Sequence, residues 1–463
     1  MNISTWQDEE VVVLGAGRSG TAAAALLAHC GAQVTLTDLR LRHEIDPELP
    51  EGIQLKLGGH PPSLFDAAPS VVISPGIPLS APAVRTAQSR GSRMLSEIEL
   101  ASSFIETDII AITGSNGKST VTSMTGAILA EAGFATAVCG NIGLPLSQVI
   151  LDQLLGSTPI ERYIVEMSSF QCETIDVFHP HFACVLNLSP DHLDRHPAFQ
   201  DYVHAKLRLL RNTSMQDWVV INADDPVLQR YRPVGSAVEV LFGGPALSTV
   251  NGPACWVESN VIRWRSPDGE ETALMPTMDL GVLGRHNELN ACAAAALGML
   301  AGASAANVRD ALGSFQGLEH RMELCGKVAG VLCINDSKAT NVEATLAAIS
   351  GFERGVWLIL GGQDKNADFN LLRPLLPGRV RRVLLIGEAT GRIAASLRGS
   401  APLQSCGTLE RAIDEGLANA EAGEILLLAP ACTSFDQYSG FEERGRCFKA
   451  LIAKRNAVPS NGD

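Results

Sequence analysis

Residues 112–120 read Ile-Thr-Gly-Ser-Asn-Gly-Lys-Ser-Thr and constrain the fold of this chain more than any other stretch. The run before it, Asp108–Ile112, is short, apolar and β-branched, which predicts a buried strand. The run after it, Val121–Gly133, is rich in Thr, Ala and Leu and stops at a glycine, as a helix does. A glycine-rich loop in this setting directs backbone N–H groups and a positive helix end to one point, where phosphate oxygens bind. The sequence therefore predicts a nucleoside triphosphate site.

The spacing of this loop departs from the common phosphate loop. The pattern GxxxxGK[ST] would place a glycine at Ile112, whereas the glycines here are Gly114 and Gly117. Lys118 adds a positive charge for the outer phosphates, and the hydroxyl of Ser119 is suited to Mg²⁺. The predicted nucleotide-binding residues are Gly114, Ser115, Asn116, Gly117, Lys118, Ser119 and Thr120.

Length and charge limit the class of protein. A chain of 463 residues is long enough for about three domains. A formal net charge of −14 argues against a general affinity for nucleic acid or anionic membranes. The eleven cysteines are scattered, which indicates reduced core residues, and the polar N-terminus does not resemble a signal peptide. The stretch Leu289–Ala306 suits a packed helix better than a membrane span. We expect a soluble, cytoplasmic protein without nucleic-acid or membrane partners.

The N-terminal part carries a dinucleotide fingerprint. The strand Val11–Leu14 runs into Gly15-Ala16-Gly17-Arg18-Ser19-Gly20, and Asp38 ends the next strand, 18 residues after Gly20. A later strand, Ser70–Ile73, runs into a turn that contains Gly76. From the residues alone, this domain binds either NAD or the diphosphate of another nucleotide.

Two further clusters of polar residues follow predicted strands in the central part. Tyr163–Val165 is followed by Glu166, and Phe182–Leu186 is followed by a segment that contains Asp191 and His192. Ligands of open parallel sheets bind beyond the carboxyl ends of the strands, so both clusters face the same crevice as Lys118. Glu166 is the natural carboxylate partner for Mg²⁺.

The C-terminal part alternates strands and helices. Its strands, from Val331–Ile334 onwards, end in small and charged residues, which is typical of a second ligand crevice. The predicted fold is α/β with three domains: a Rossmann-like domain over residues 1–103, a central P-loop-type ATPase domain with a mostly parallel sheet over 104–315, and a C-terminal Rossmann-like domain over 316–463.

A triphosphate loop is found in kinases, in NTPase switches and in ATP-dependent ligases. Switches and motors are usually built around one nucleotide domain, whereas this chain adds two domains with clefts of their own. This organisation favours a ligase that activates a carboxylate as an acyl phosphate, which an amine then attacks. A dehydrogenase and a non-catalytic nucleotide-binding regulator are the alternatives from other classes.

The motifs along the whole chain resemble those of the Mur ligase family. They are Thr113–Thr120, Gly140–Gly143, Glu166–Gln171, Asp191–Arg195, Gly284–Asn290, Gly317–Arg321 and Asn335–Asn341. The first of these are shared by Mur ligases and folylpolyglutamate synthases, and the departure in the phosphate loop is the form of this family. Asp336–Asn341 and Cys432–Gln437 resemble the D-glutamate-adding branch. Another amide ligase of the same superfamily is the nearest alternative.

The resemblance implies an ATP-dependent ligase that adds D-glutamate to UDP-N-acetylmuramoyl-L-alanine through an acyl phosphate, in the synthesis of peptidoglycan precursors. It implies that the first domain holds UDP rather than NAD. The residues matching this site are Arg18, Ser19, Asp38, Arg40 and Gly76.

Further roles follow from the same resemblance. Asn141 contacts both the nucleotide side and the substrate, Asn290 contacts adenine, and Arg321 and Asp336 reach ATP. Without the resemblance, a helix cap or a cross-link between helices explains Asn290 better than a contact with adenine, and an interdomain salt bridge explains Arg321 better than a contact with ATP.

The resemblance also implies a metal centre of two Mg²⁺ ions. Ser119 and Glu166 bind the first ion, and His192 and Lys206 are placed at the second. Lys206, in the predicted helix Phe199–Leu210, matches a family lysine that CO₂ carbamylates, which turns an ammonium into an oxygen ligand. Without the resemblance, Lys206 reads as a solvated surface lysine. Lys118, Glu166, His192 and Lys206 form the predicted catalytic set.

The C-terminal residues that match the D-glutamate pocket are Lys338, Thr340, Lys365, Ser434 and Phe441. Two lysines and two hydroxyls suit a substrate with two carboxylates, because each desolvated anion needs donors. We expect a monomer that closes about hinges near Ser103 and Gly313–Gly317.

Overall fold

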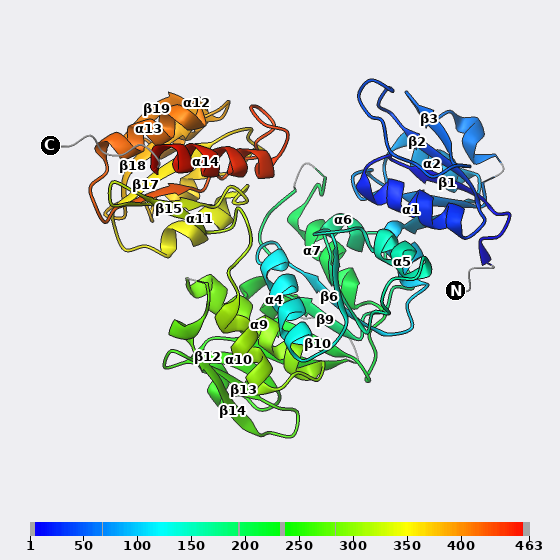
Figure 1. Ribbon diagram of the computed structural model, residues 1–463, viewed down its shortest axis with the longest axis horizontal. Helices are drawn as coiled ribbons and strands as arrows, with labels where there is room; N and C mark the ends of the chain where they lie inside the picture. Colours follow the sequence, from blue (N-terminus) through cyan, green and yellow to red (C-terminus); the bar gives the residue numbers. More distant parts are fainter. Residues whose placement is uncertain (1–4, 67, 193–194, 232–236, 283, 457–463) are drawn as a thin grey trace. The chain divides into compact units, whose positions relative to one another are not determined.

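The computed structural model describes residues 5–66, 68–192, 195–231, 237–282 and 284–456. The chain forms two compact units (Figure 1). The first unit comprises residues up to 280 together with 288–314, and the second comprises 281–287 and the residues from 315 onwards. The expected domain limits at 103/104 and 315/316 stay predictions.

The first sheet of the first unit has five parallel strands in the order β3-β2-β1-β4-β5. Its strands are β1 (Glu10–Leu14), β2 (Gln33–Asp38), β3 (Gln54–Leu57), β4 (Ser70–Ile73) and β5 (Arg93–Ser96). Its helices are α1 (Arg18–His29), η2 (Pro62–Phe65) and α2 (Pro82–Ser89). The glycine-rich turn lies between β1 and α1, as the fingerprint predicts.

The second sheet of this unit has nine strands in the order β14-β13-β12-β11-β10-β9-β6-β8-β7. They are β6 (Asp108–Thr113), β7 (Thr136–Gly140), β8 (Arg162–Glu166), β9 (Phe182–Val185), β10 (Trp218–Asn222), β11 (Val238–Gly243), β12 (Ala254–Glu258), β13 (Val261–Arg265) and β14 (Glu271–Pro276). The strands from β7 to β12 are parallel, and β13 and β14 are antiparallel. Register pairs Ile112 with Glu166 and Thr113 with Val185, so both predicted polar clusters flank the phosphate loop.

The helical segments of this part of the unit are α4 (Lys118–Glu131), α5 (Leu146–Leu154), α6 (Ser169–Cys172), α7 (Phe199–Leu207), η3 (Arg208–Leu210), α8 (Pro226–Arg230), η4 (Pro245–Thr249), η5 (Thr277–Asp279), α9 (Arg285–Leu300) and α10 (Ala305–Ser314). The helix after the phosphate loop thus begins at Lys118, three residues before the predicted start. The stretch Leu289–Ala306 is not one helix, because the chain turns at Gly302, whose φ is +105°.

The helix α3 (Glu97–Ser102) links the two sheets of the first unit. One hydrophobic cluster includes Leu27 of α1, Ile98 of α3 and Ile150 of α5. Figure 1 shows α1 beside α5, in line with this shared core. The two sheets therefore pack through a common apolar layer, and the first unit shows no division near the predicted hinge at Ser103.

The second unit contains a six-stranded sheet in the order β15-β16-β20-β17-β18-β19, parallel except for β15. Its strands are β15 (Glu323–Val328), β16 (Val331–Asn335), β17 (Val356–Gly361), β18 (Val380–Ile386), β19 (Leu403–Gly407) and β20 (Ile425–Leu428). Its helical segments are α11 (Val342–Ser350), η6 (Phe369–Leu372), α12 (Thr390–Leu397), α13 (Leu409–Asn419) and α14 (Phe441–Asn456). Separate apolar clusters fill its two faces.

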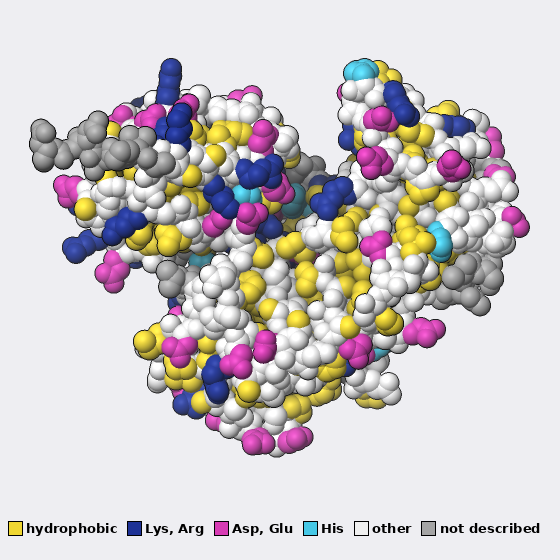
Figure 2. All heavy atoms as spheres, in the orientation of Figure 1, with side chains coloured by type: hydrophobic (Ala, Val, Ile, Leu, Met, Phe, Trp, Pro, Cys, Tyr) yellow, Lys and Arg dark blue, Asp and Glu magenta, His cyan; other side chains and the backbone are white. Residues whose placement is uncertain are grey.

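Two observations concern partners and membranes. Among the described residues, no helix has both the length and the apolar character needed to cross a bilayer. Figure 2 shows Asp and Glu side chains interspersed with Lys and Arg side chains on the visible face of each unit.

The close approach of α1 to its preceding turn yields a test of the first sheet. A Cβ built at Gly20 would lie 1.8 Å from the carbonyl oxygen of Gly15, whereas one at Gly17 meets nothing within 4 Å. We expect Gly20→Ala to destabilise the first unit by about 3 kcal/mol, the upper end of overpacking costs, because the contact is with backbone. Gly17→Ala serves as the control and should change stability by less than about 0.5 kcal/mol. Thermal unfolding followed by calorimetry measures both, and equal transitions would show that the turn shifts freely.

Candidate active site

The phosphate loop requires both of its glycines. Gly114 and Gly117 have φ angles of +154° and +88°, which L side chains rarely adopt. A Cβ at Gly117 would lie 2.5 Å from Oδ1 of Asn290, and one at Gly114 would lie 2.9 Å from Cβ of Leu186. The predicted adenine-contacting residue Asn290, on α9, therefore lies directly against the loop.

Asn187, two residues after the end of β9, holds one side of the loop by hydrogen bonds. Its Oδ1 accepts from the Asn116 backbone N–H at 2.8 Å, and its Nδ2 donates to the Asn116 carbonyl at 2.9 Å. Oγ of Ser115 lies 3.0 Å from the Ser189 carbonyl and 2.9 Å from the hydroxyl of Tyr202. Tyr202 was missed by sequence reasoning, although it precedes Lys206 by four residues and so shares its helix face.

Two lysine side chains converge on the start of the loop. Nζ of Lys118 donates to the carbonyls of Gly114 and Ser115, each at 2.8 Å. Nζ of Lys206 donates to the same Gly114 carbonyl at 2.8 Å and lies 4.9 Å from the centre of the Tyr202 ring. The interpretation of Lys206 as a solvated surface residue is wrong, because the side chain is buried at 1% exposure.

Burial and charge together change the protonation of Lys206. Desolvation, and then the neighbouring charge of Lys118, lower the pKa of Lys206 to about 7. The carboxylates of Asp191 and Glu166 act in the opposite direction, which also places them within electrostatic reach of this amine. At neutral pH a large fraction of Lys206 is therefore an uncharged amine.

Glu166 ends β8 beside the loop and is buried at 1% exposure. Its Oε1 accepts from Nδ2 of Asn141 at 2.7 Å, and its carbonyl accepts from the Asn141 backbone at 2.9 Å. A Cβ at Gly140 would lie 2.5 Å from that carbonyl oxygen, so the turn before Asn141 requires glycine. The predicted residues Glu166 and Asn141 thus form one hydrogen-bonded pair.

His192 has a positive φ of +52°, an unusual conformation for a residue with a side chain. Its ring packs edge-on against Phe170, with centroids 4.8 Å apart, and its Nε2 lies 3.7 Å from Oδ2 of Asp191. The next two residues of this motif, Leu193 and Asp194, lie outside the described residues. Arg195 then donates to Glu173 at 2.6 Å and to the Ile77 carbonyl at 3.1 Å.

The residues around the loop fit Mg²⁺ better than a metal held entirely by protein. Ser119, in the first turn of α4, is buried at 2% exposure, and Glu166 supplies a carboxylate. Within the described residues no three His, Cys, Asp or Glu side chains form a metal cluster. Mg²⁺ usually takes one or two carboxylates and completes its shell with phosphate oxygens and water, so this donor set suits it.

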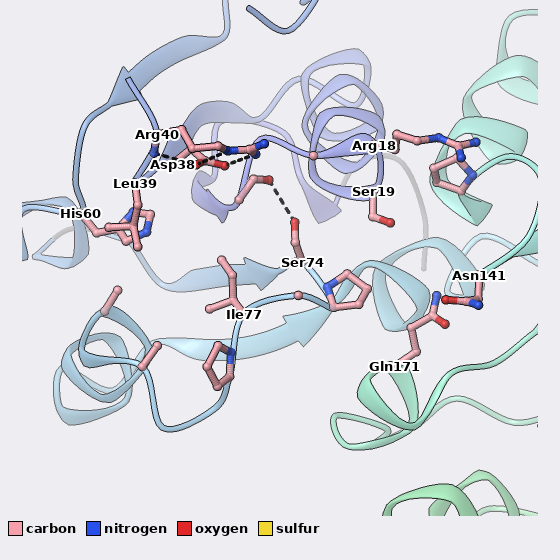
Figure 3. A pocket seen from close by; sticks show the side chains of 18 of the residues that line it. Arg18, Ser19, Asp38, Leu39, Arg40, His60, Ser74, Ile77, Asn141 and Gln171 are labelled. Carbon is pink, nitrogen blue, oxygen red and sulfur yellow. Dashed lines mark hydrogen bonds and ion pairs between the residues drawn. The ribbon is translucent and has the colours of Figure 1, made fainter. Parts of the chain in front are cut away.

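A cavity of about 1030 Å³ opens beside the first sheet and extends to the second (Figure 3). Its lining includes the five residues predicted to surround the UDP group, Arg18, Ser19, Asp38, Arg40 and Gly76, and also Asn141, which was predicted to contact both the nucleotide side and the substrate. Sequence reasoning did not assign other lining residues, among them Leu39, His60, Ser74, Ile77 and Gln171. Ser74 and Ile77 flank the predicted Gly76, so their position after β4 was the available signal.

Asp38 does not present a free carboxylate to this cavity. Arg40 donates to Oδ1 and Oδ2 at 2.9 and 2.7 Å, and the Ala16 backbone N–H donates to Oδ2 at 2.8 Å (Figure 3). The Arg40 guanidinium, by its hydrogen bonds, holds the pKa of Asp38 well below its usual range. In an NAD site the corresponding carboxylate accepts hydrogen bonds from the ribose hydroxyls. Here the Asp38 carboxylate already accepts hydrogen bonds from Arg40 and from the Ala16 backbone.

The second unit brings its predicted residues together at the carboxyl ends of β16 and β20. Oγ of Ser337 donates to the Phe441 carbonyl at 2.8 Å, and Nζ of Lys338 lies 5.4 Å from the centre of the Phe441 ring. Thr340 follows directly, with its backbone N–H 2.8 Å from the Lys338 carbonyl. Lys338, Thr340 and Phe441 therefore occupy one region.

The segment containing Ser434 is held by a buried guanidinium. Arg444, at 1% exposure, donates to the carbonyls of Cys432, Thr433 and Ser337 at 3.1, 3.2 and 2.9 Å. Gln363 and Thr433 exchange two backbone N–H···O hydrogen bonds, of 2.9 and 3.0 Å. Gln363 precedes the exposed Lys365 by two residues and Thr433 directly precedes Ser434, so this pairing brings the two segments side by side. Sequence reasoning missed Arg444, because a charged side chain on a helix is usually exposed.

Asp336 and Arg321 are electrostatic neighbours in the second unit. Burial raises the pKa of the Asp336 carboxyl to about 6, while the charge of Arg321 opposes this shift. The backbone of Met322 lies 3.4 Å from Oδ1 of Asp336. The contact of these two residues with ATP stays a prediction.

Three sequence profiles match this chain. Residues 9–96 match the Mur ligase MurD-like N-terminal domain, residues 112–298 the Mur ligase middle domain, and residues 320–432 the Mur ligase glutamate ligase domain. The UDP-N-acetylmuramoylalanine–D-glutamate ligase of Acidobacterium capsulatum is 40% identical over 455 residues, which are 97% of each chain. The ligase of the same name from Koribacter versatilis is 41% identical over 451 residues, 96% of this chain and 97% of that protein.

Solved structures resemble the fold. The MurF ligase of Thermotoga maritima in complex with ADP superposes with a TM-score of 0.60 at 15% identity, covering 98% of this chain and 97% of that chain. A pseudomurein peptide ligase type C from Methanothermus fervidus gives a TM-score of 0.59 at 20% identity, covering 96% and 100%. At these identities the likeness shows the three-sheet α/β architecture alone.

Proposed function

Because the chain belongs to the Mur ligase family, we propose that it joins D-glutamate to UDP-N-acetylmuramoyl-L-alanine, with conversion of ATP to ADP and phosphate. The observation that supports this proposal most is an identity near 40%, over 97% of the chain, to ligases named for this reaction. The cavity beside the first sheet is the site we assign to the UDP group, the loop around Lys118 is assigned to the triphosphate, and the region around Lys338 is assigned to the amino acid.

The reaction begins with transfer of the γ-phosphoryl group. A carboxylate oxygen of the substrate's alanyl residue attacks the γ-phosphorus, and ADP leaves with the bridging oxygen. Lys118, now bonded to the carbonyls of its own loop, turns to the phosphates and stabilises their developing charge. Ser119 and Glu166 would hold Mg²⁺, which would supply positive charge to the phosphate oxygens. Asn290 takes the adenine, and Arg321 and Asp336 contact ATP.

The second step is attack of the amine on the acyl phosphate. The neutral amine nitrogen of D-glutamate forms the amide bond and loses one proton to solvent, and phosphate leaves with the electron pair of the broken C–O bond. The UDP-muramoyl group is held by the cavity residues named above, which include Arg18 and Asn141. The incoming amino acid is bound by five residues of the second unit: Lys338, Thr340, Lys365, Ser434 and Phe441. Alignment of the two substrates supplies ~7–11 kcal/mol of barrier reduction.

Lys206 serves this reaction as a carbamate. Only an uncharged amine attacks CO₂, and the pKa of about 7 leaves much of Lys206 uncharged at neutral pH. The amine nitrogen bonds to carbon and releases a proton, which leaves an anionic carbamate beside Lys118. This anion and His192 would serve the second Mg²⁺.

The activity is tested by phosphate release with ATP, Mg²⁺ and UDP-N-acetylmuramoyl-L-alanine. We expect release with D-glutamate and at most background release with L-glutamate, with L-lysine or without an amino acid. Release with another amino acid would keep the family and overturn the amino-acid assignment. If NAD(H) bound instead and no release occurred with any amino acid, the first-domain assignment would fail as well.

The carbamate is tested with Lys206→Ala. We expect this variant to lose at least ~99% of the rate, because losing one preorganised charged group costs about 2.7–4 kcal/mol. Short carboxylates such as acetate should restore part of it by entering the space vacated by the carbamate. The control is Lys56→Ala, at an exposed lysine of β3, which should keep the full rate and ignore acetate. Normal activity in Lys206→Ala, or its complete indifference to carboxylates, would contradict the assignment.

The amino-acid pocket is tested with Lys365→Ala. Loss of one charged hydrogen-bonding partner costs about 1.5–3 kcal/mol, so we expect the KM for D-glutamate to rise at least ~10-fold. The KM for ATP should remain within a factor of about two, because the pocket belongs to the other substrate. Steady-state kinetics with each substrate varied in turn measure both constants. An equal rise in the two values would place Lys365 elsewhere.

A further inference from the structure

The linker helix α3 carries two buried carboxylates that the proposed reaction does not use. Glu97 is 1% exposed and Glu99 is 2% exposed, although α3 has only six residues. Burying a carboxylate is costly unless hydrogen bonds satisfy it. Both side chains accept hydrogen bonds from backbone N–H groups of segments between strands of the second sheet, although Oε2 of Glu97 has no hydrogen-bond partner among the described residues.

Glu99 binds the segment that follows α6. Its Oε1 accepts from the backbone N–H groups of Asp176, Val177 and Phe178 at 2.7, 3.2 and 2.9 Å, and its Oε2 accepts from Val177 at 3.2 Å. The helix α6 contributes Gln171 to the wall of the large cavity. Glu99 therefore fixes the chain immediately after one wall of that cavity.

Glu97 binds the first turn of α5. Its Oε1 accepts from the Ser147 backbone N–H at 2.5 Å; burial raises the pKa of this carboxyl to about 7, and the hydrogen bond from Ser147 opposes that shift. The segment just before α5 supplies Asn141, Gly143 and Pro145 to the cavity. The second carboxylate thus fixes another part of the same wall.

The opposite wall of the cavity is tied to α3 through the first sheet. The helix continues directly from β5, whose Ser96 pairs with Ile73 at the end of β4. The residues just after β4, from Ser74 to Pro78, line the cavity. The short helix α3 is consequently joined to both walls of the cavity. It continues from β5, which pairs with the strand before the Ser74–Pro78 wall, and its two carboxylates bind the segments next to the wall formed by Asn141, Gly143, Pro145 and Gln171.

We propose that Glu97 and Glu99 are positioning residues that hold the two walls of this cavity in register for the UDP-muramoyl substrate. The identity of that substrate rests on the proposed function. The wall contacts at the cavity itself are sparser: Arg18 donates to the Gly143 carbonyl, and Arg195 donates to the Ile77 carbonyl at 3.1 Å. Glu99 alone provides four backbone hydrogen bonds and makes the larger contribution.

The test uses Glu99→Gln, which keeps the size of the side chain and removes its charge and one acceptor. The control is Glu106→Gln, at an exposed carboxylate on the same linker. Calorimetric titration measures the Kd of UDP-N-acetylmuramoyl-L-alanine and of a non-hydrolysable ATP analogue. We expect the Kd of UDP-N-acetylmuramoyl-L-alanine to rise at least ~10-fold, because the hydrogen bonds weakened by the substitution are charge-assisted and support the cavity. The Kd of the ATP analogue should stay within about twofold, because these bonds do not support the phosphate loop. The control should change neither.

Equal weakening of both ligands would reveal general destabilisation and overturn the proposal, and so would unchanged binding of both. If Glu99→Gln does not fold, as judged by its thermal transition, Glu97→Gln takes its place. It retains the acceptor for Ser147 but loses the charge, and the same split between the two ligands is expected.

A ligand-independent measurement separates this proposal from the proposed function. Spin labels attached by non-cysteine chemistry at the exposed positions Gln88 on α2 and Glu131 on α4 report the distance between the two sheets. We expect a broader distance distribution in Glu99→Gln than in the wild type and in Glu106→Gln. If the distribution broadens in Glu99→Gln but the wild-type protein does not bind UDP-N-acetylmuramoyl-L-alanine, the positioning role is supported and the proposed function is rejected. An unchanged distribution would reject the positioning role.

Discussion

Two lysine ammonium groups donate to one backbone carbonyl, that of Gly114, and much of the first unit is arranged around this meeting point. Two like charges near one buried oxygen repel each other, and only an anion or a loss of charge relieves the repulsion. The structure contains both solutions. The positive N-terminal end of α4, which begins at Lys118, suits phosphate oxygens, and the depressed pKa of Lys206 allows this amine to be neutral.

The parts that surround this centre are fixed by backbone contacts more than by long side chains. The side chain of Asn187 forms two hydrogen bonds with the Asn116 backbone. Gly117 lies against Asn290, and the turn at Gly140 lies against the carbonyl of Glu166. Each of these contacts leaves too little space for an added side chain or a shifted loop. Such preorganisation suits phosphoryl transfer, in which positioning and electrostatics supply most of the catalysis.

In the cavity beside the first sheet and in the region around Lys338, an arginine is paired with groups of the protein itself. In the first unit Arg40 is committed to Asp38, so the cavity presents a neutral ion pair together with apolar lining residues such as Leu39 and Ile77. In the second unit Arg444 donates to backbone carbonyls, and Nζ of Lys338 lies 5.4 Å from the centre of the Phe441 ring. In both places a buried or paired arginine holds the segment that carries residues predicted to bind substrate.

The sequence by itself determined the local elements and the kinds of residue at their ends. A short apolar, β-branched run, a glycine-rich loop and a run rich in Thr, Ala and Leu predicted the strand, loop and helix around Lys118. Reading where apolar runs give way to polar residues located the segments after β8, β9 and β16. It did not find the antiparallel pair β13 and β14 or the break at Gly302, because short apolar runs and isolated glycines do not specify their partners. Tertiary structure alone decided that Lys206 is buried, that Asp38 is paired with Arg40, and that α3 holds the second sheet through Glu97 and Glu99. These properties depend on atoms far apart in the sequence, because burial, electric fields and backbone hydrogen bonds arise only when distant segments pack together.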